Sequence, residues 1–161
     1  MNRNRIDRPF VRAGIVLGIG LGGFVDGIVL HQILQWHHML TSAGFPATTV
    51  SNMEVNMVAD GLFDATTWVI TVVGLVLLWR AKKQNELPPM RIFVGSIATG
   101  WGLFNLVEGI IDHHILGIHH VRSGPNQTVW DLAFLALGAA LVVIGWILVL
   151  RGRGKLATQR S

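Results

Sequence analysis

Four apolar segments, each long enough to cross a lipid bilayer as a helix, constrain the fold of this 161-residue chain more than any other feature. The hydrocarbon core of a bilayer is about 30 Å thick and needs about 20 apolar residues in a helix. The four segments cover roughly residues 11–36, 57–79, 92–114 and 129–150. Because a chain in lipid must satisfy its own backbone hydrogen bonds, helices are the favoured structure there. We therefore expect an all-α integral membrane four-helix bundle.

Composition places the chain in a membrane rather than in water. Of its residues 51% are apolar and only 14% are charged, which is too apolar for an ordinary soluble domain. The first apolar run is too long for a signal peptide, and no small-residue cleavage site follows it. The chain has no cysteine, so disulfides and thiolate metal sites are excluded. We expect a single membrane domain over residues 1–161 whose first partner is the lipid bilayer.

The basic residues predict the orientation of the chain in the membrane. All of them except Arg122 lie in the N-terminal arm, between the second and third spans, or in the C-terminal tail. Because these blocks flank apolar runs, we interpret the net charge of +4 as membrane flanks and not as a nucleic-acid surface. The positive-inside rule then predicts a protein of the bacterial inner membrane with both termini in the cytoplasm.

A pattern of acid-Gly-Ile-x-x-His-x-Ile-Leu-x-x-His-His occurs twice, over residues 26–38 and 108–120. Both copies close apolar runs, and together they hold all seven histidines. We interpret the chain as two repeated helical hairpins, about residues 12–80 and 91–151, related by a pseudo-two-fold axis along the membrane normal. With both termini inside, the two histidine clusters would face outward.

Carboxylates gather in the same part of the chain as the histidines. An ionisable side chain within the bilayer costs at least about 2.5 kcal/mol on insertion scales and is a functional candidate by default. Imidazole suits zinc, copper and iron, and a carboxylate adds a hard oxygen ligand. The candidate metal ligands are Asp26, His31, His37, His38, Asp60, Asp64, Glu108, Asp112, His113, His114, His119, His120 and Asp131. Nearby methionines at positions 39, 53 and 57 favour copper in an oxidising compartment, with zinc or iron as the alternative.

Helical spacing sorts the residues of the first copy into two faces. At about 100° per residue in an α-helix, Asp26 shares a face with His37. On the same basis, His31 shares another face with Gln35 and His38. On an α-helical wheel Asp26 and His31 thus fall on different faces of the first span.

The depth of these side chains in the membrane also follows from their positions. The histidine pairs 37–38 and 119–120 fall at the membrane surface, either as a polar cap or as a lid that captures the ion. The second span of each half carries an acid near its outer end, so Asp64 matches Asp131 in this interpretation. We expect eight side chains to approach one another at the bundle axis, with Asp26 and Glu108 deepest. They are Asp26, His31, Asp60, Asp64, Glu108, Asp112, His113 and Asp131.

Several functions fit the sequence. The first is a metal-binding membrane protein that receives, holds or delivers copper. The second is a metalloenzyme of hydrolase or oxidase type, with zinc or a dinuclear centre, in which Asp26, Asp64 or Glu108 acts as general base on an amphiphilic substrate. The third is a haem protein with His31 and His113 as axial ligands. An ion pathway is disfavoured because the cytoplasmic half of the second and fourth spans has almost no polar residues.

The chain also resembles a known family over about residues 12–151. The motifs that carry the resemblance are Gly23-Phe24-Val25-Asp26-Gly27, His31, Asp60-Gly61-Leu62-Phe63-Asp64 and the segment from Asn105 to His114. They are similar to those of a DUF family of small four-span bacterial membrane proteins with a repeated Asp/Glu-Gly-Ile…His…His-His motif. Members of that family look like neighbours of proteins that assemble copper-containing respiratory oxidases. The resemblance thus implies copper as the metal and an oxidase or its assembly factors as partners, while the sequence leaves self-association to a homo-oligomer open.

Overall fold

The computed structural model describes residues 7–85 and 87–158, and helices dominate this part of the chain. The elements are α1 (Arg8–Phe24), η2 (Val25–Ile33), α2 (Val50–Gln84), α3 (Met90–Glu108), η3 (Gly109–Ile115) and α4 (Gln127–Thr158), of which η2 and η3 are π-helices that continue α1 and α3. Four helical stretches are long and apolar enough to cross a membrane. The prediction of an all-α membrane bundle with four spans is confirmed.

The second span is longer than its apolar pattern predicts. Helix α2 begins at Val50, where the Thr49 side chain accepts a hydrogen bond of 3.2 Å from the backbone N–H of Asn52. Such a cap satisfies one of the free N–H groups of a helix N-terminus. The first turns of α2 are polar, so hydropathy alone did not reveal them. These turns carry Asn56 and Asp60 toward the end of the molecule that lies opposite to the chain termini.

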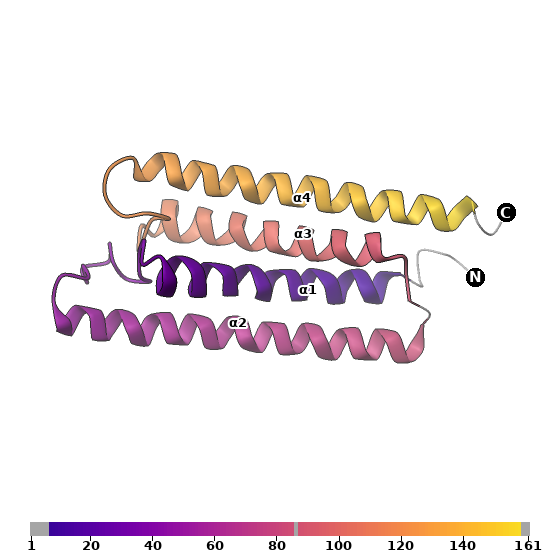
Figure 1. The fold of residues 1–161 in the computed structure, drawn as a ribbon, viewed down its shortest axis with the longest axis horizontal. Coiled ribbons are helices and arrows are strands. Elements are labelled where there is room, and N and C mark those ends of the chain that lie inside the picture. Colours follow the sequence, from indigo (N-terminus) through magenta and orange to yellow (C-terminus); the bar gives the residue numbers. More distant parts are fainter. Residues whose placement is uncertain (1–6, 86, 159–161) are drawn as a thin grey trace.

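The four helices form a flat layer in the order α2, α1, α3, α4 (Figure 1). Contacts join α2 to α1, α1 to α3 and α3 to α4, and in the described part of the chain α2 and α4 do not approach each other. In the apolar part of the first span, 50% of the residues are buried inside the protein, compared with 11% in the second span, α2. The exposed side chains of α2 and α4 are largely apolar, as expected for helices that face lipid.

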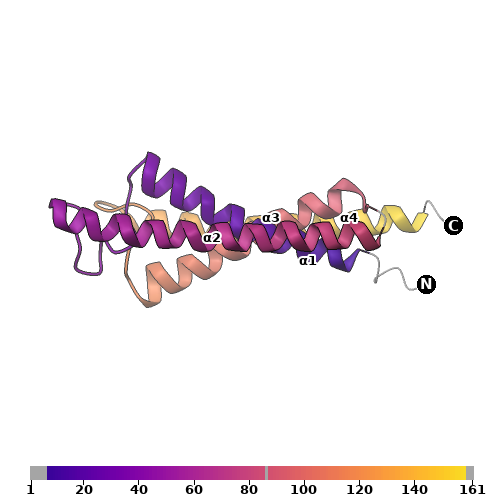
Figure 2. The ribbon, with the colours of Figure 1, turned by 90° about the horizontal axis from the view of Figure 1, so that it is seen from below.

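Helices α1 and α3 cross in the middle of the layer at a pair of glycines (Figure 2). A Cβ atom at Gly18 would overlap the backbone carbonyl oxygen of Ile97, and one at Gly100 would overlap that of Ile15. Small residues let membrane helices approach until their backbones touch. The contacts are reciprocal, and each glycine stands eight residues before the acid that begins the repeated pattern, Asp26 or Glu108.

The chain turns back on itself where each π-helix ends. Gln35 and Gly117 have positive φ angles of 49° and 58°, which reverse the chain after the last helical turn. The backbone N–H of Ser42 then donates to the Ile118 carbonyl at 2.9 Å, and that of Ser123 donates to the Trp36 carbonyl at 3.1 Å. Each returning loop is therefore hydrogen-bonded to the other one.

Candidate metal centre

Four buried imidazoles lie together at the end of α1 and α3. The side chains are those of His31, His37, His113 and His119, and each residue is at most 3% exposed. The rings of His37 and His119 stack with their centroids 4.7 Å apart and their planes 6° from parallel. The centroid of His31 is 4.4 Å from that of His37, and the centroid of His113 is 4.9 Å from that of His119. The order in space is thus His31, His37, His119, His113.

The π-helices bring an acid and a histidine of each copy onto one face. In a π-helix the backbone hydrogen bonds join residues i and i+5, so residues five apart lie on the same face of the helix. Asp26 Oδ2 is 3.1 Å from His31 Nε2, and Glu108 Oε1 is 2.9 Å from His113 Nε2. The helical wheel places Asp26 and His31 on different faces because it assumes the α-helical period, whereas the two side chains do approach each other, as expected. The chain then reverses after Ile33, and this reversal brings the His37 ring beside that of His31.

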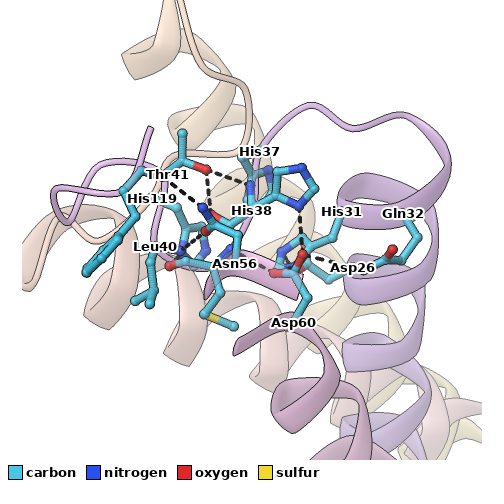
Figure 3. A network of polar contacts seen from close by, with 12 residues as sticks. Asp26, His31, Gln32, His37, His38, Leu40, Thr41, Asn56, Asp60 and His119 are labelled. Carbon is cyan, nitrogen blue, oxygen red and sulfur yellow. Dashed lines mark hydrogen bonds and ion pairs between the residues drawn. The ribbon is translucent and has the colours of Figure 1, made fainter. Parts of the chain in front are cut away.

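Asp60 on α2 orients His31 from the side opposite to Asp26 (Figure 3). Its carboxylate accepts hydrogen bonds from His31 Nδ1 at 3.0 Å, from His38 Nδ1 at 2.7 Å and from the backbone N–H of Met39 at 2.8 Å. The same aspartate thus fixes a ring of η2 and the returning loop. Gln32 Nε2 donates to the same carboxylate at 3.4 Å. Because Asp60 is itself fully buried, these four donors replace the water that it loses.

Asp131 on α4 has the same role in the second half. Its carboxylate lies 3.5 Å from His113 Nδ1 and accepts hydrogen bonds from His120 Nδ1 at 2.7 Å and from the Val121 N–H at 2.9 Å. The counterpart of Asp131 is therefore Asp60 and not Asp64. We had paired Asp131 with Asp64 because each lies near the outer end of its span. Helix α2 begins several residues earlier than expected, at Val50, so Asp64 lies farther from that end than we assumed.

His37 and His119 are oriented by backbone carbonyls instead of carboxylates. His37 Nδ1 donates to the Val121 carbonyl at 2.8 Å, and His119 Nδ1 donates to the Met39 carbonyl at 3.2 Å. A carbonyl oxygen only accepts, so Nδ1 of each ring carries a proton. Nε2 of His119 lies 2.8 Å from Glu108 Oε1, whereas Nε2 of His37 has no hydrogen-bond partner. Burial, together with the nearby His31 and His119, lowers the pKa of His37 to about 2. The His37 ring is consequently neutral, with Nε2 free to coordinate.

Six side chains direct ligand atoms inward, and we call them the inner ligand set. They are Asp26, His31, His37, Glu108, His113 and His119. Ligand atoms lie within 4.8 Å of one another in two groups, one of His31, His37 and His119 and one of Glu108, His113 and His119.

Several inward atoms of this set are buried without a well-aligned hydrogen bond. They are both oxygens of Asp26, Oε2 of Glu108, and the Nε2 atoms of His31, His37 and His113. An unsatisfied buried polar atom costs about 1–3 kcal/mol. Asp26 and His31 lie against each other, as do Glu108 and His113, and together these groups could hold a cation.

The remaining predicted ligands lie outside the inner ligand set. His38 and His120 are partly buried and bind Asp60 and Asp131, so they support the loops. His114 is exposed, Asp112 is partly exposed, and Asp64 packs against the backbone at Gly27. His37 and His119, which we expected at the membrane surface as a cap or lid, are among the most buried side chains of the protein, so they do not form an exposed cap.

Sequence reasoning missed the groups that hold the returning loops in place. Asn56 on α2 is fully buried, accepts from the Leu40 N–H at 2.9 Å and donates to the Phe45 carbonyl at 2.8 Å. The carbonyls of Met39 and Val121 orient two imidazoles. Backbone groups leave no signal in side-chain identity, although the polar run before residue 57 was a cue for Asn56.

The methionines do not add a thioether to the inner ligand set. Met53 and Met57 are 39% and 63% exposed on α2. Met39 contributes only backbone groups to the hydrogen bonds of the site. The donors that converge are therefore nitrogen and oxygen.

The arrangement of the rings disfavours a haem between His31 and His113. The rings of His37 and His119 lie between them, with every centroid distance to His31 or His113 at 6.4 Å or less. A porphyrin in that place would have to displace both. The four imidazoles thus fit bare ions better than a macrocycle.

The chain matches one family model over residues 13–152, and that model is described as predicted membrane protein (DUF2243). The chain belongs to this family. No curated protein and no solved structure matches it. The DUF2243 match spans all four helices and both sequence copies, so it includes the whole inner ligand set.

Proposed function

We propose that this DUF2243 protein binds transition-metal ions in its inner ligand set. The observation that carries the proposal is the partner of each Nδ1 atom: a carboxylate for His31 and His113, and a backbone carbonyl for His37 and His119. Metal-bound histidines almost always place their second ring nitrogen against such an acceptor, which fixes the ring and makes the other nitrogen more basic. Nε2 of His37 has no hydrogen-bond partner, and the other three Nε2 atoms face the carboxylates of Asp26 and Glu108. An ion in this place would be bound by the four Nε2 atoms together with these carboxylates.

The charge of the site supports two divalent ions. The carboxylates of Asp26, Asp60, Glu108 and Asp131 are all at most 5% exposed. In the described chain none of them pairs with a lysine or arginine; their ionic partners are histidines. Two divalent ions would balance four carboxylates, and the convergent ligand atoms fall into two groups. We therefore propose a dinuclear centre.

Copper is the first candidate for the element. The donor set of imidazole and carboxylate accommodates Cu(II), and it also suits zinc and iron. The family resemblance supports copper, and in that case the protein would hold or deliver it. The recipient would be a respiratory oxidase or one of its assembly factors.

Elemental analysis tests this proposal. The full chain is purified in detergent after growth with added copper, zinc or iron, and its absorption spectrum is recorded on the same sample. We expect about two ions per chain with one of the metals, in line with the two ligand groups. Substoichiometric metal in all three preparations would overturn the proposal, and a Soret band would replace it with haem.

A metalloenzyme is the second candidate function, and one observation favours it. The two groups of convergent atoms each contain three side chains and share His119, so an ion bound by one complete group would have three protein ligands, as in catalytic zinc sites that keep a position open for water or substrate. Asp26 or Glu108 would then act as general base. In the cobalt-substituted protein, azide should change the visible spectrum if a position is open, and an unchanged spectrum would contradict an enzymatic centre.

Removing the charge of Asp60 should weaken metal binding without removing a ligand. Asp60→Asn leaves the inner ligand set intact but loses the anionic acceptor of His31 Nδ1. Losses of this kind lower metal affinity about 10–100-fold, measured by competition with a chelator. Asp64→Asn, one turn along α2, is the matched control and should bind like the wild type. Equal affinities for all three proteins would contradict the assigned role of Asp60.

The proposed orientation has both termini in the cytoplasm and the inner ligand set near the outer face of the bacterial inner membrane. The basic segments that flank the spans at the end of the molecule where both termini lie support this orientation. A green fluorescent protein fused to the C-terminus should fluoresce, and alkaline phosphatase inserted after Ser123 should be active. The opposite pattern, with a dark C-terminal fusion and an inactive phosphatase, would reverse the orientation.

A further inference from the structure

A cavity beside Asp26 opens between α1, α3 and α4, and we call it the tryptophan cavity. It holds about 250 Å³, and its wall includes Trp36, Trp101, Trp130 and Phe134. Val25 and Leu137 at its edge are 37% and 52% exposed. Because these exposed residues lie on apolar spans, the mouth of the cavity faces lipid. A molecule that enters must therefore be soluble in the bilayer.

The polar floor of the tryptophan cavity has hydrogen-bonding capacity that the protein does not use. Asp26 is 3% exposed, and its Oδ1 atom has no hydrogen bond. Asn105 is 2% exposed and lines the same cavity. The equivalent residue in the first sequence copy is Gly23, so the amide is specific to this side of the molecule.

Size and wall chemistry define the ligand class. A cavity of about 150 Å³ can hold benzene, so 250 Å³ has room for one ring with substituents. Trp36 and Trp130 lie 5.2 Å apart, and the Arg122 guanidinium lies 5.3 and 5.5 Å from their centroids. These contacts hold two aromatic walls in place. Aromatic rings pack favourably against such walls, in stacked or edge-to-face geometry.

We propose that the tryptophan cavity binds a single-ring phenol or quinol dissolved in the bilayer. The ring packs against the tryptophans, the hydroxyl donates to Asp26 Oδ1, and the hydroxyl oxygen accepts from the Asn105 amide. The bound phenol would lie beside the proposed metal centre, because both use Asp26. Only this relation to the metal rests on the proposed function. Binding itself needs the cavity and not the ion.

A second cavity on the other side of α1 and α3 differs in these respects. It holds about 310 Å³ and is lined by Glu108, Asp112, Phe63 and Phe104 among others, with no tryptophan in its wall. Its polar groups are two carboxylates and no amide, so they can only accept hydrogen bonds. It therefore lacks the donor that a hydroxyl oxygen requires, and the proposal concerns the tryptophan cavity alone.

Quenching of tryptophan fluorescence tests the proposal, with 4-bromophenol as the probe. Its bromine quenches nearby indoles, and 4-bromotoluene is the matched probe without a hydroxyl. The detergent-purified full chain, as isolated and after chelator treatment, should show saturable quenching with 4-bromophenol. With 4-bromotoluene we expect only the linear quenching of a partitioned solute. Equal, non-saturable quenching by both probes would overturn the proposal.

Two variants locate the bound ring. Ala133→Phe blocks the cavity wall on α4 and should abolish the saturable component, whereas Ala136→Phe, on a lipid-exposed site of the same helix, should keep it. Asn105→Leu should weaken binding about fivefold through the lost hydrogen bond. Saturable quenching that survives Ala133→Phe would contradict this site.

Melting temperature and metal content are measured on each variant. Phenol binding that fails while metal binds overturns only this inference. Metal that fails to bind while phenol binds overturns only the proposed function.

Discussion

Replacing His37 with glutamine should lower metal affinity more than about 100-fold, because it removes a ligand and not just the support of a ligand. The His37 ring is neutral and buried, and its Nε2 atom has no other partner. Glutamine is polar and can still donate to the Val121 carbonyl that accepts from His37, so the loop should keep its place. Chelator competition and elemental analysis measure the effect.

His114→Gln is the matched control for His37→Gln. His114 belongs to the same sequence pattern but is exposed, so its replacement should leave affinity and stoichiometry unchanged. Unaltered metal binding in His37→Gln, with an unaltered melting temperature, would remove His37 from the site. If His114→Gln lost as much metal affinity as His37→Gln, membership of the sequence pattern and not burial would determine which histidines bind the metal.

Gly100→Ala should destabilise the fold by about 3 kcal/mol, at the upper end of the cost of overpacking. The new Cβ atom would overlap the backbone carbonyl oxygen of Ile15 at the crossing of α1 and α3. A backbone atom cannot move aside as a side chain can, so the two central helices must separate. The measurement is the free energy of unfolding in detergent.

Gly61→Ala is the opposite case on α2. A Cβ atom at Gly61 meets no atom within 4 Å, and alanine is favoured over glycine within a helix by up to about 1 kcal/mol. This variant should be as stable as the wild type or slightly more stable. Equal destabilisation by Gly61→Ala and Gly100→Ala would show that the close crossing does not hold the layer together.

The spans were predictable from sequence because hydropathy over some twenty residues has one physical solution in lipid. The start of α2 was not, because its first turns are polar and held by the Thr49 cap. The order of the helices in the layer was not either. It depends on which glycines touch, and Gly18 and Gly100 look like many other small residues in the sequence.

The composition of the site was predictable, but its geometry was not. Acids and histidines gathered in one part of the chain, and all six members of the inner ligand set were among the candidates. Their directions depend on the π-helices and on the reversals at Gln35 and Gly117. No periodicity in the sequence announces a change from i+4 to i+5 bonds. The helical wheel therefore separated Asp26 from His31, which lie 3.1 Å apart.

X-ray absorption spectroscopy at the edge of the bound metal tests most directly whether the inner ligand set holds the ion. We expect only nitrogen and oxygen neighbours at about 2.0 Å, with the multiple scattering of at least two imidazoles per ion and no sulfur. His31→Gln and His113→Gln should each reduce the imidazole signal. A first shell of water alone, or one that contains sulfur from methionine, would contradict a centre built from the inner ligand set.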